Sequence, residues 1–181
     1  MMSSDSGTPL LNRESIRAIA HQIRDIHTAI TGQACARFDV IHFLEVVLPK
    51  LDENFSLEVC EQAEMREDNG LMIPSQNLIK IREDVYANAL KGQGRDRFTI
   101  THELGHYILH RNLGLAFRTK PRPLAIYQSI EWQADCFAGE LLVDSRLINA
   151  GTSMNHVAQL FGVSTQAAEY QLRQLKLKSL I

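Results

Sequence analysis

Apolar positions in the first part of the chain follow helical spacing. Between Arg13 and Ile30 apolar residues recur three or four positions apart, and Gly32 follows as a stop signal. A second helix is predicted to begin with Asp39 as its N-cap and to end at Pro49. The chain therefore begins with two amphipathic helices.

After these helices the pattern changes to short apolar runs separated by turn residues. Three runs are predicted strands: Ser56–Cys60, Gly70–Ile73 and Leu78–Ile81. Asp68-Asn69-Gly70 separates the first two runs, and Pro74-Ser75 separates the last two. Turn residues between short β-tolerant runs indicate hairpins, so we expect a small antiparallel three-stranded sheet.

Helical spacing returns in the second half of the chain. We expect helices over Arg97–His110 and Ile126–Val143, with Asn112–Ala125 as the loop between them. Ser153–Leu177 is predicted to form two short helices that turn at Gly162, in the manner of a helix-turn-helix. The order of helices, small sheet and helices predicts an α+β domain.

Composition narrows the classes of function. The chain has 181 residues, of which 45% are hydrophobic and 22% charged, as in an ordinary globular domain. Its net charge of −2 provides no overall basic field for DNA or anionic lipid, and no apolar run reaches the roughly 18 residues of a membrane span. Three cysteines without a C-x-x-C pair exclude a disulfide framework and favour a reduced, cytoplasmic protein. Direct nucleic-acid binding and membrane insertion are therefore not expected.

The strongest chemical signal is the pentapeptide His102-Glu103-Leu104-Gly105-His106, which matches the H-E-x-x-H pattern of zinc peptidases. Two histidines four residues apart lie one above the other on a helix, so both imidazoles can reach one metal ion. Glu103 is rotated by about 100° from His102 and can contact a water on that metal without binding the metal itself. The pattern predicts a zinc site in which Glu103 is the base.

A catalytic zinc takes a third protein ligand, and a carboxylate is one of its usual choices. Glu131 and Asp135 lie four residues apart in a predicted helix that also carries a long apolar stripe. One hypothesis makes Glu131 the third ligand and Asp135 the acceptor of a ligand imidazole N–H. The alternative is that Glu131 is a carboxylate favoured by the helix dipole and that Asp135 is merely solvated.

Two runs of sequence resemble the ImmA/IrrE family of zinc metallopeptidases. They are RFTITHELGHYILH from Arg97 and EWQADCFAGELL from Glu131. The chain departs from the family pattern at Thr101, where Ala is usual, and at Val143-Asp144, where Met-Pro is common. The resemblance implies zinc bound by His102, His106 and Glu131, with Glu103 as general base.

The residue pattern and the resemblance together suggest an organisation for the chain. We expect a disordered N-terminus (1–9) and a zincin-like metallopeptidase domain (10–150) that holds the active-site helices. The C-terminal helical pair (151–181) is expected to be packed on this domain or continuous with it.

The function implied by the resemblance is cytoplasmic zinc-dependent cleavage of a helix-turn-helix repressor. Such a repressor would control a phage, a mobile element, a toxin–antitoxin pair or a stress operon. The oxyanion of the reaction needs a donor, for which Tyr107, His110 and Tyr127 are candidates between which the sequence does not decide. The alternative is a toxin-like or regulatory partner of a repressor or antitoxin, which would use the zincin fold for docking rather than catalysis.

Overall fold

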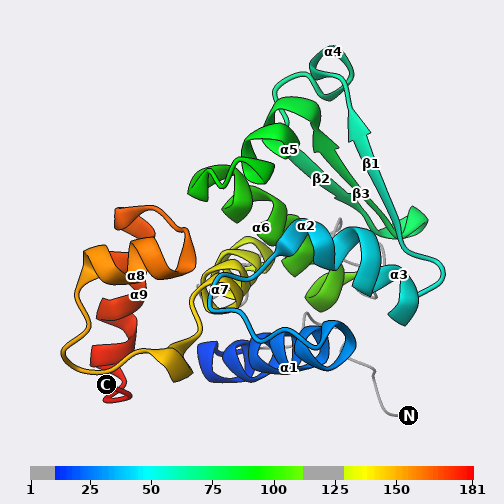
Figure 1. The fold of residues 1–181 in the computed structure, drawn as a ribbon. Helices are drawn as coiled ribbons and strands as arrows, with labels where there is room; N and C mark the ends of the chain where they lie inside the picture. Colours follow the sequence, from blue (N-terminus) through cyan, green and yellow to red (C-terminus); the bar gives the residue numbers. More distant parts are fainter. Residues whose placement is uncertain (1–10, 112–128) are drawn as a thin grey trace, which may run out of the picture.

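The computed structural model describes residues 11–111 and 129–181 (Figure 1). The expected disordered N-terminus, the expected loop Asn112–Ala125 and the candidate Tyr127 lie outside these ranges. In chain order the elements are α1 (Arg13–Thr31), α2 (Val40–His42), a π-helical turn (Phe43–Val47), α3 (Leu48–Leu51), β1 (Ser56–Cys60), α4 (Gln62–Met65), β2 (Gly70–Ile73), a 3-10 turn (Pro74–Gln76), β3 (Leu78–Arg82), α5 (Glu83–Leu90), α6 (Gly94–His110), α7 (Ile130–Leu142), a 3-10 turn (Ser145–Leu147), α8 (Met154–Phe161) and α9 (Thr165–Leu177). A mostly helical chain with one small sheet confirms the α+β prediction. Among the described residues, no helix is both long and apolar enough to cross a membrane.

The predicted N-terminal helix is confirmed, including its stop signal. Gly32 adopts the left-handed conformation, with φ of 70°, and its N–H bonds the carbonyl of Thr28. The second helical segment begins as predicted, with the Asp39 side chain accepting the N–H of His42. It runs two residues beyond Pro49 to Leu51, because Pro49 lies in the first turn of α3, where a missing N–H is tolerated.

The sheet is mixed rather than antiparallel, so that part of the prediction is wrong. The strand order is β1-β3-β2; β2 pairs antiparallel with β3, whereas β1 pairs parallel with β3. The turn residues before Gly70 do not close a hairpin, because the segment after β1 contains α4. The connection through α4 instead leads from one edge of the sheet to the other. β2 runs opposite to β1 and β3 runs opposite to β2, so the central strand β3 runs in the same direction as β1.

A further helix that the sequence pattern does not predict follows β3 directly. α5 has Glu83 and Asp84 in its first turn, where carboxylates interact favourably with the helix dipole. It buries only Val85 and Ala89. A helix of eight residues with two buried positions leaves too short an apolar period to recognise in the sequence.

The core is built where α7 packs between α6 and α1 (Figure 1). Gly105 of α6 allows the close approach of α7, because a Cβ there would lie 3.1 Å from the Phe137 ring and 3.2 Å from the Ala134 backbone. β2 lies against the same helix α6. A second apolar cluster joins the end of α7, at Leu142 and Val143, to α8 and α9. The two helices that carry the candidate site are thus held by tight packing.

Buried arginines tie the elements together through two kinds of acceptor. Glu140 of α7 is 1% exposed and accepts from Arg13 Nη1 and Arg17 Nε of α1, each at 2.7 Å. Arg97 of α6 instead donates to backbone carbonyls: Phe38 O at 2.6 Å, Phe161 O at 2.8 Å and Gly162 O. α1 is therefore fixed to α7 by ion pairs, and the turn after α8 is fixed to α6 by its main chain.

Candidate metal centre

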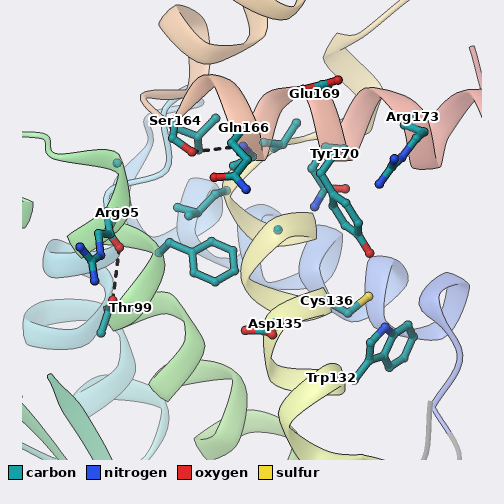
Figure 2. Close-up of a pocket in the computed structure, with 18 of the residues that line it drawn as sticks. Arg95, Thr99, Trp132, Asp135, Cys136, Ser164, Gln166, Glu169, Tyr170 and Arg173 are labelled. Carbon is teal, nitrogen blue, oxygen red and sulfur yellow. Dashed lines mark hydrogen bonds between the residues drawn. The ribbon is translucent and has the colours of Figure 1, made fainter. Parts of the chain in front are cut away.

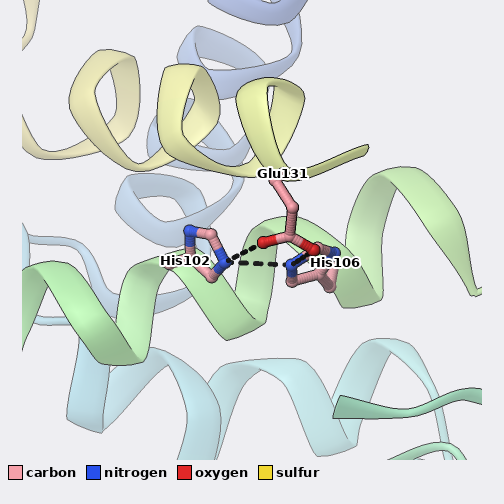
Figure 3. A group of neighbouring side chains, drawn as sticks. All are labelled: His102, His106 and Glu131. Carbon is pink, nitrogen blue, oxygen red and sulfur yellow. Dashed lines mark hydrogen bonds and ion pairs between the residues drawn. The ribbon is translucent and has the colours of Figure 1, made fainter. Parts of the chain in front are cut away.

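Three side chains of the predicted site converge between α6 and α7 (Figure 3). His102 and His106 project from α6, and Glu131 projects from the first turn of α7. The two Nε2 atoms lie 2.9 Å apart. Glu131 places Oε2 3.4 Å from His102 Nε2 and Oε1 3.6 Å from His106 Nε2. Glu131 therefore faces the histidine pair, although its side chain is 66% exposed.

These donor atoms fit a zinc ion. Ligand bonds of about 2.0–2.1 Å in a tetrahedron place the donor atoms about 3.3 Å from one another. The separations of 2.9, 3.4 and 3.6 Å lie on either side of that value. Two imidazole nitrogens and one carboxylate also form a donor set that catalytic zinc sites use, with a fourth position left for water. His102, His106 and Glu131 are the residues that would hold the ion.

Asp135 lies one turn after Glu131 on α7 and contacts the first histidine. Its Oδ1 is 2.8 Å from His102 Nδ1. Burial disfavours the imidazolium of His102, but the hydrogen bond to Asp135 and the nearby Glu103 outweigh it and raise the pKa of His102. When the Nδ1–H of His102 donates to Asp135, its Nε2 lone pair is directed toward the convergence point, as a metal ligand requires.

His110 and Gln133 lie behind the second histidine. His110 Nδ1 is 3.2 Å from His106 Nδ1, and His110 Nε2 is 3.3 Å from Gln133 Oε1. Burial lowers the pKa of His110 to about 4, so the ring is neutral at neutral pH. Gln133 is fully buried. Sequence reasoning missed Gln133, since a glutamine between apolar helix positions has no motif of its own.

Two of the candidates for the oxyanion donor, Tyr107 and His110, lie in the described part of the chain, and the polar atoms of both are engaged elsewhere. Tyr107 is fully buried and donates its hydroxyl to Asp52 at 2.8 Å. His110 has both ring nitrogens engaged, with His106 and Gln133. Neither residue is free to stabilise a developing oxyanion. No other residue in the described part of the chain is identified as the donor.

Glu103 lies between α6 and the edge strand β2. Its side chain is 9% exposed, and burial raises its pKa to about 7, although His102 and a hydrogen bond from the Met72 backbone lower it. Gly70 of β2 makes room for the side chain, because a Cβ there would lie 2.7 Å from Glu103 Cγ. A buried carboxyl group with a raised pKa can both accept and return a proton near neutral pH.

A groove of about 920 Å³ opens beside the centre (Figure 2). It lies between α6, α7 and α9, with Phe98, Trp132 and Tyr170 among its lining residues. Asp135 also lines it, so one carboxylate contacts His102 and borders the groove. Asp135 is thus the residue through which the groove borders the centre, since His102, His106 and Glu131 are not among its lining residues.

Comparison with known proteins agrees with this arrangement. A family model described as the IrrE N-terminal-like domain matches residues 56–173, which is more than half of the chain. Metallopeptidase ImmA of Bacillus subtilis (strain 168) is 27% identical over 151 residues, covering 74% of this chain and 84% of that protein. No solved structure gives a significant match. The matched region includes each of the converging side chains.

Proposed function

The chain belongs to the ImmA/IrrE family of metallopeptidases, and from this premise we propose that it is a zinc-dependent endopeptidase. The observation that carries the proposal is the convergence of His102, His106 and Glu131 on one point. Two helices packed through Gly105 hold these side chains in place. Such a donor set, with room for water, is suited to hydrolysis.

Each residue of the centre has a role in the proposed reaction. Zinc, when bound, polarises the scissile carbonyl and lowers the pKa of water toward 7. Glu103 accepts a proton from the attacking water and returns it to the leaving amine. Asp135 orients His102 by accepting its Nδ1–H. The groove beside Asp135 offers space for the polypeptide on the α9 side of the centre.

We propose a helix-turn-helix transcriptional repressor as the substrate, on the strength of the family resemblance. Cleavage would relieve repression of a phage, a mobile element, a toxin–antitoxin pair or a stress operon. A reducing compartment suits the protein, because Cys35, Cys60 and Cys136 are all free thiols. The cytoplasm, where such repressors act, is therefore the proposed location.

Metal content and cleavage together test the proposal. The purified chain should contain about one zinc per molecule, and a chelator should remove both the metal and the cleavage of a repressor encoded next to its gene. Elemental analysis and mass spectrometry of the fragments provide the two measurements. Cleavage that survives complete removal of metal would contradict the proposal. A repressor that binds but stays intact would instead support the docking alternative.

Gly70→Ala should slow cleavage without removing the metal. The added Cβ would lie 2.7 Å from Glu103 Cγ, so the side chain of the base must move. A misplaced catalytic group lowers the rate by on the order of 10- to 100-fold. Steady-state kinetics beside zinc analysis checks this expectation. Gly151→Ala is the matched control, because its Cβ would meet only Asn149 Oδ1 at an ordinary 3.5 Å. Equal rates for both variants would show that Glu103 tolerates the displacement.

A further inference from the structure

We infer that His110 and Gln133 are positioning residues that fix the metal-facing tautomer of His106. The inference rests on the proposed zinc site and explains two side chains to which that site gives no role. Both are buried: His110 is 6% exposed and Gln133 is fully buried. They link His106 of α6 to α7. His110 Nδ1 lies 3.2 Å from His106 Nδ1, and Gln133 Oε1 lies 3.3 Å from His110 Nε2.

The direction of the hydrogen bonds follows from the requirement at the metal. A histidine that binds zinc through Nε2 offers its lone pair there and therefore carries its proton on Nδ1. The Nδ1–H of His106 points to His110 Nδ1, which must then accept. His110 consequently carries its own proton on Nε2 and donates it to Gln133 Oε1. Each contact then has one donor and one acceptor.

His110 is not a reserve metal ligand in this geometry. Its Nδ1 faces the Nδ1 of His106, on the opposite side of that ring from Nε2. Among the described residues, the group of ligand atoms around this point, all within 4.8 Å of one another, consists of His102, His106 and Glu131. His110 therefore acts on the site through His106.

The two histidine ligands are oriented by different chemistry. His102 donates to Asp135, a carboxylate whose side chain is 60% exposed. His106 donates to a neutral imidazole backed by a neutral amide, both inside the protein. A buried carboxylate in place of Gln133 would carry a large desolvation penalty, which the neutral pair avoids. We call the hydrogen-bonded chain from His106 through His110 to Gln133 the relay. The relay orients His106 without burying another charge.

Zinc affinity and histidine tautomers test the inference with readouts other than catalysis. Gln133→Met keeps an unbranched side chain but removes the acceptor, and it should raise the zinc Kd about 10-fold. His110→Phe should raise it by about 10- to 100-fold. Competition with a chromophoric chelator measures both, and Gln62→Met, at an exposed position of α4, is the control and should bind like the wild type.

Nitrogen-15 NMR of the zinc-loaded wild-type chain needs no variant and reports the protons directly. It should show His106 and His110 as neutral rings, with the proton of His106 on Nδ1 and that of His110 on Nε2. A proton on His110 Nδ1, or a Gln133→Met variant with wild-type zinc affinity, would overturn the relay while leaving the zinc site intact. A wild-type chain that binds no zinc would overturn the proposed function and the relay together.

Discussion

Glu103→Gln should abolish peptide cleavage while the protein keeps its metal. The amide has the size of the carboxylate, so it still fits against Gly70, but it cannot take a proton from water. Loss of a general base lowers the rate by on the order of 10²- to 10⁴-fold. Cleavage kinetics and elemental analysis on the same preparation check both parts of this expectation.

The control for this substitution is Glu53→Gln, an exposed position outside the centre. It should cleave at the wild-type rate. Normal cleavage by Glu103→Gln would show that another group activates the water. Loss of the metal in that variant would show instead that Glu103 belongs to the ligand set, and the assignment of the base would then have to change.

Glu140→Ala should cause the largest loss of stability of any single substitution described here. It leaves the guanidinium groups of Arg13 and Arg17, both buried, without the carboxylate that each contacts at 2.7 Å. Removing one partner of a buried ion pair lowers the free energy of unfolding by about 3–5 kcal/mol. Urea denaturation of the metal-free variant and wild type measures the difference.

Glu169→Ala is the matched control for this prediction. Glu169 is an exposed glutamate of α9, and its loss should change the free energy of unfolding by less than about 0.5 kcal/mol. A loss below about 1 kcal/mol for Glu140→Ala would mean that the arginines reach water or other acceptors. The attachment of α1 to α7 would then depend on apolar packing rather than on these charges.

The sequence predicts the long helices and the strands well because their signals are local. Gly32 ends α1 through its own backbone conformation, and turn residues between short apolar runs mark the strands. The parallel pairing of β1 depends on where the chain returns after α4, which is not a local property. The eight-residue α5 is likewise defined more by its neighbours than by its own apolar period.

The same division applies to the centre. His102 and His106 are predictable because four-residue spacing on one helix fixes their proximity. The proximity of Glu131 to the histidines depends on the packing of α7 against α6, which residue spacing does not predict. The family resemblance is what implies that Glu131 is a ligand. Gln133 has no signal in the sequence, because its position beside His110 arises only when α6 and α7 pack together. Asp135 differs from Gln133, because its four-residue spacing from Glu131 on one helix already suggests that it contacts a ligand histidine.

Because Arg97 donates to main-chain oxygens, the exposed side chains of α8 and α9 can change without loss of these hydrogen bonds. Every residue type presents the same carbonyl, so replacements at most exposed sites of α8 and α9 leave this anchor untouched. Gly162 is the exception, because a Cβ there would lie 2.7 Å from Arg97 Nη1. Exposed positions of this helical pair can therefore vary while Arg97 and the apolar cluster keep the pair attached to α6 and to the end of α7.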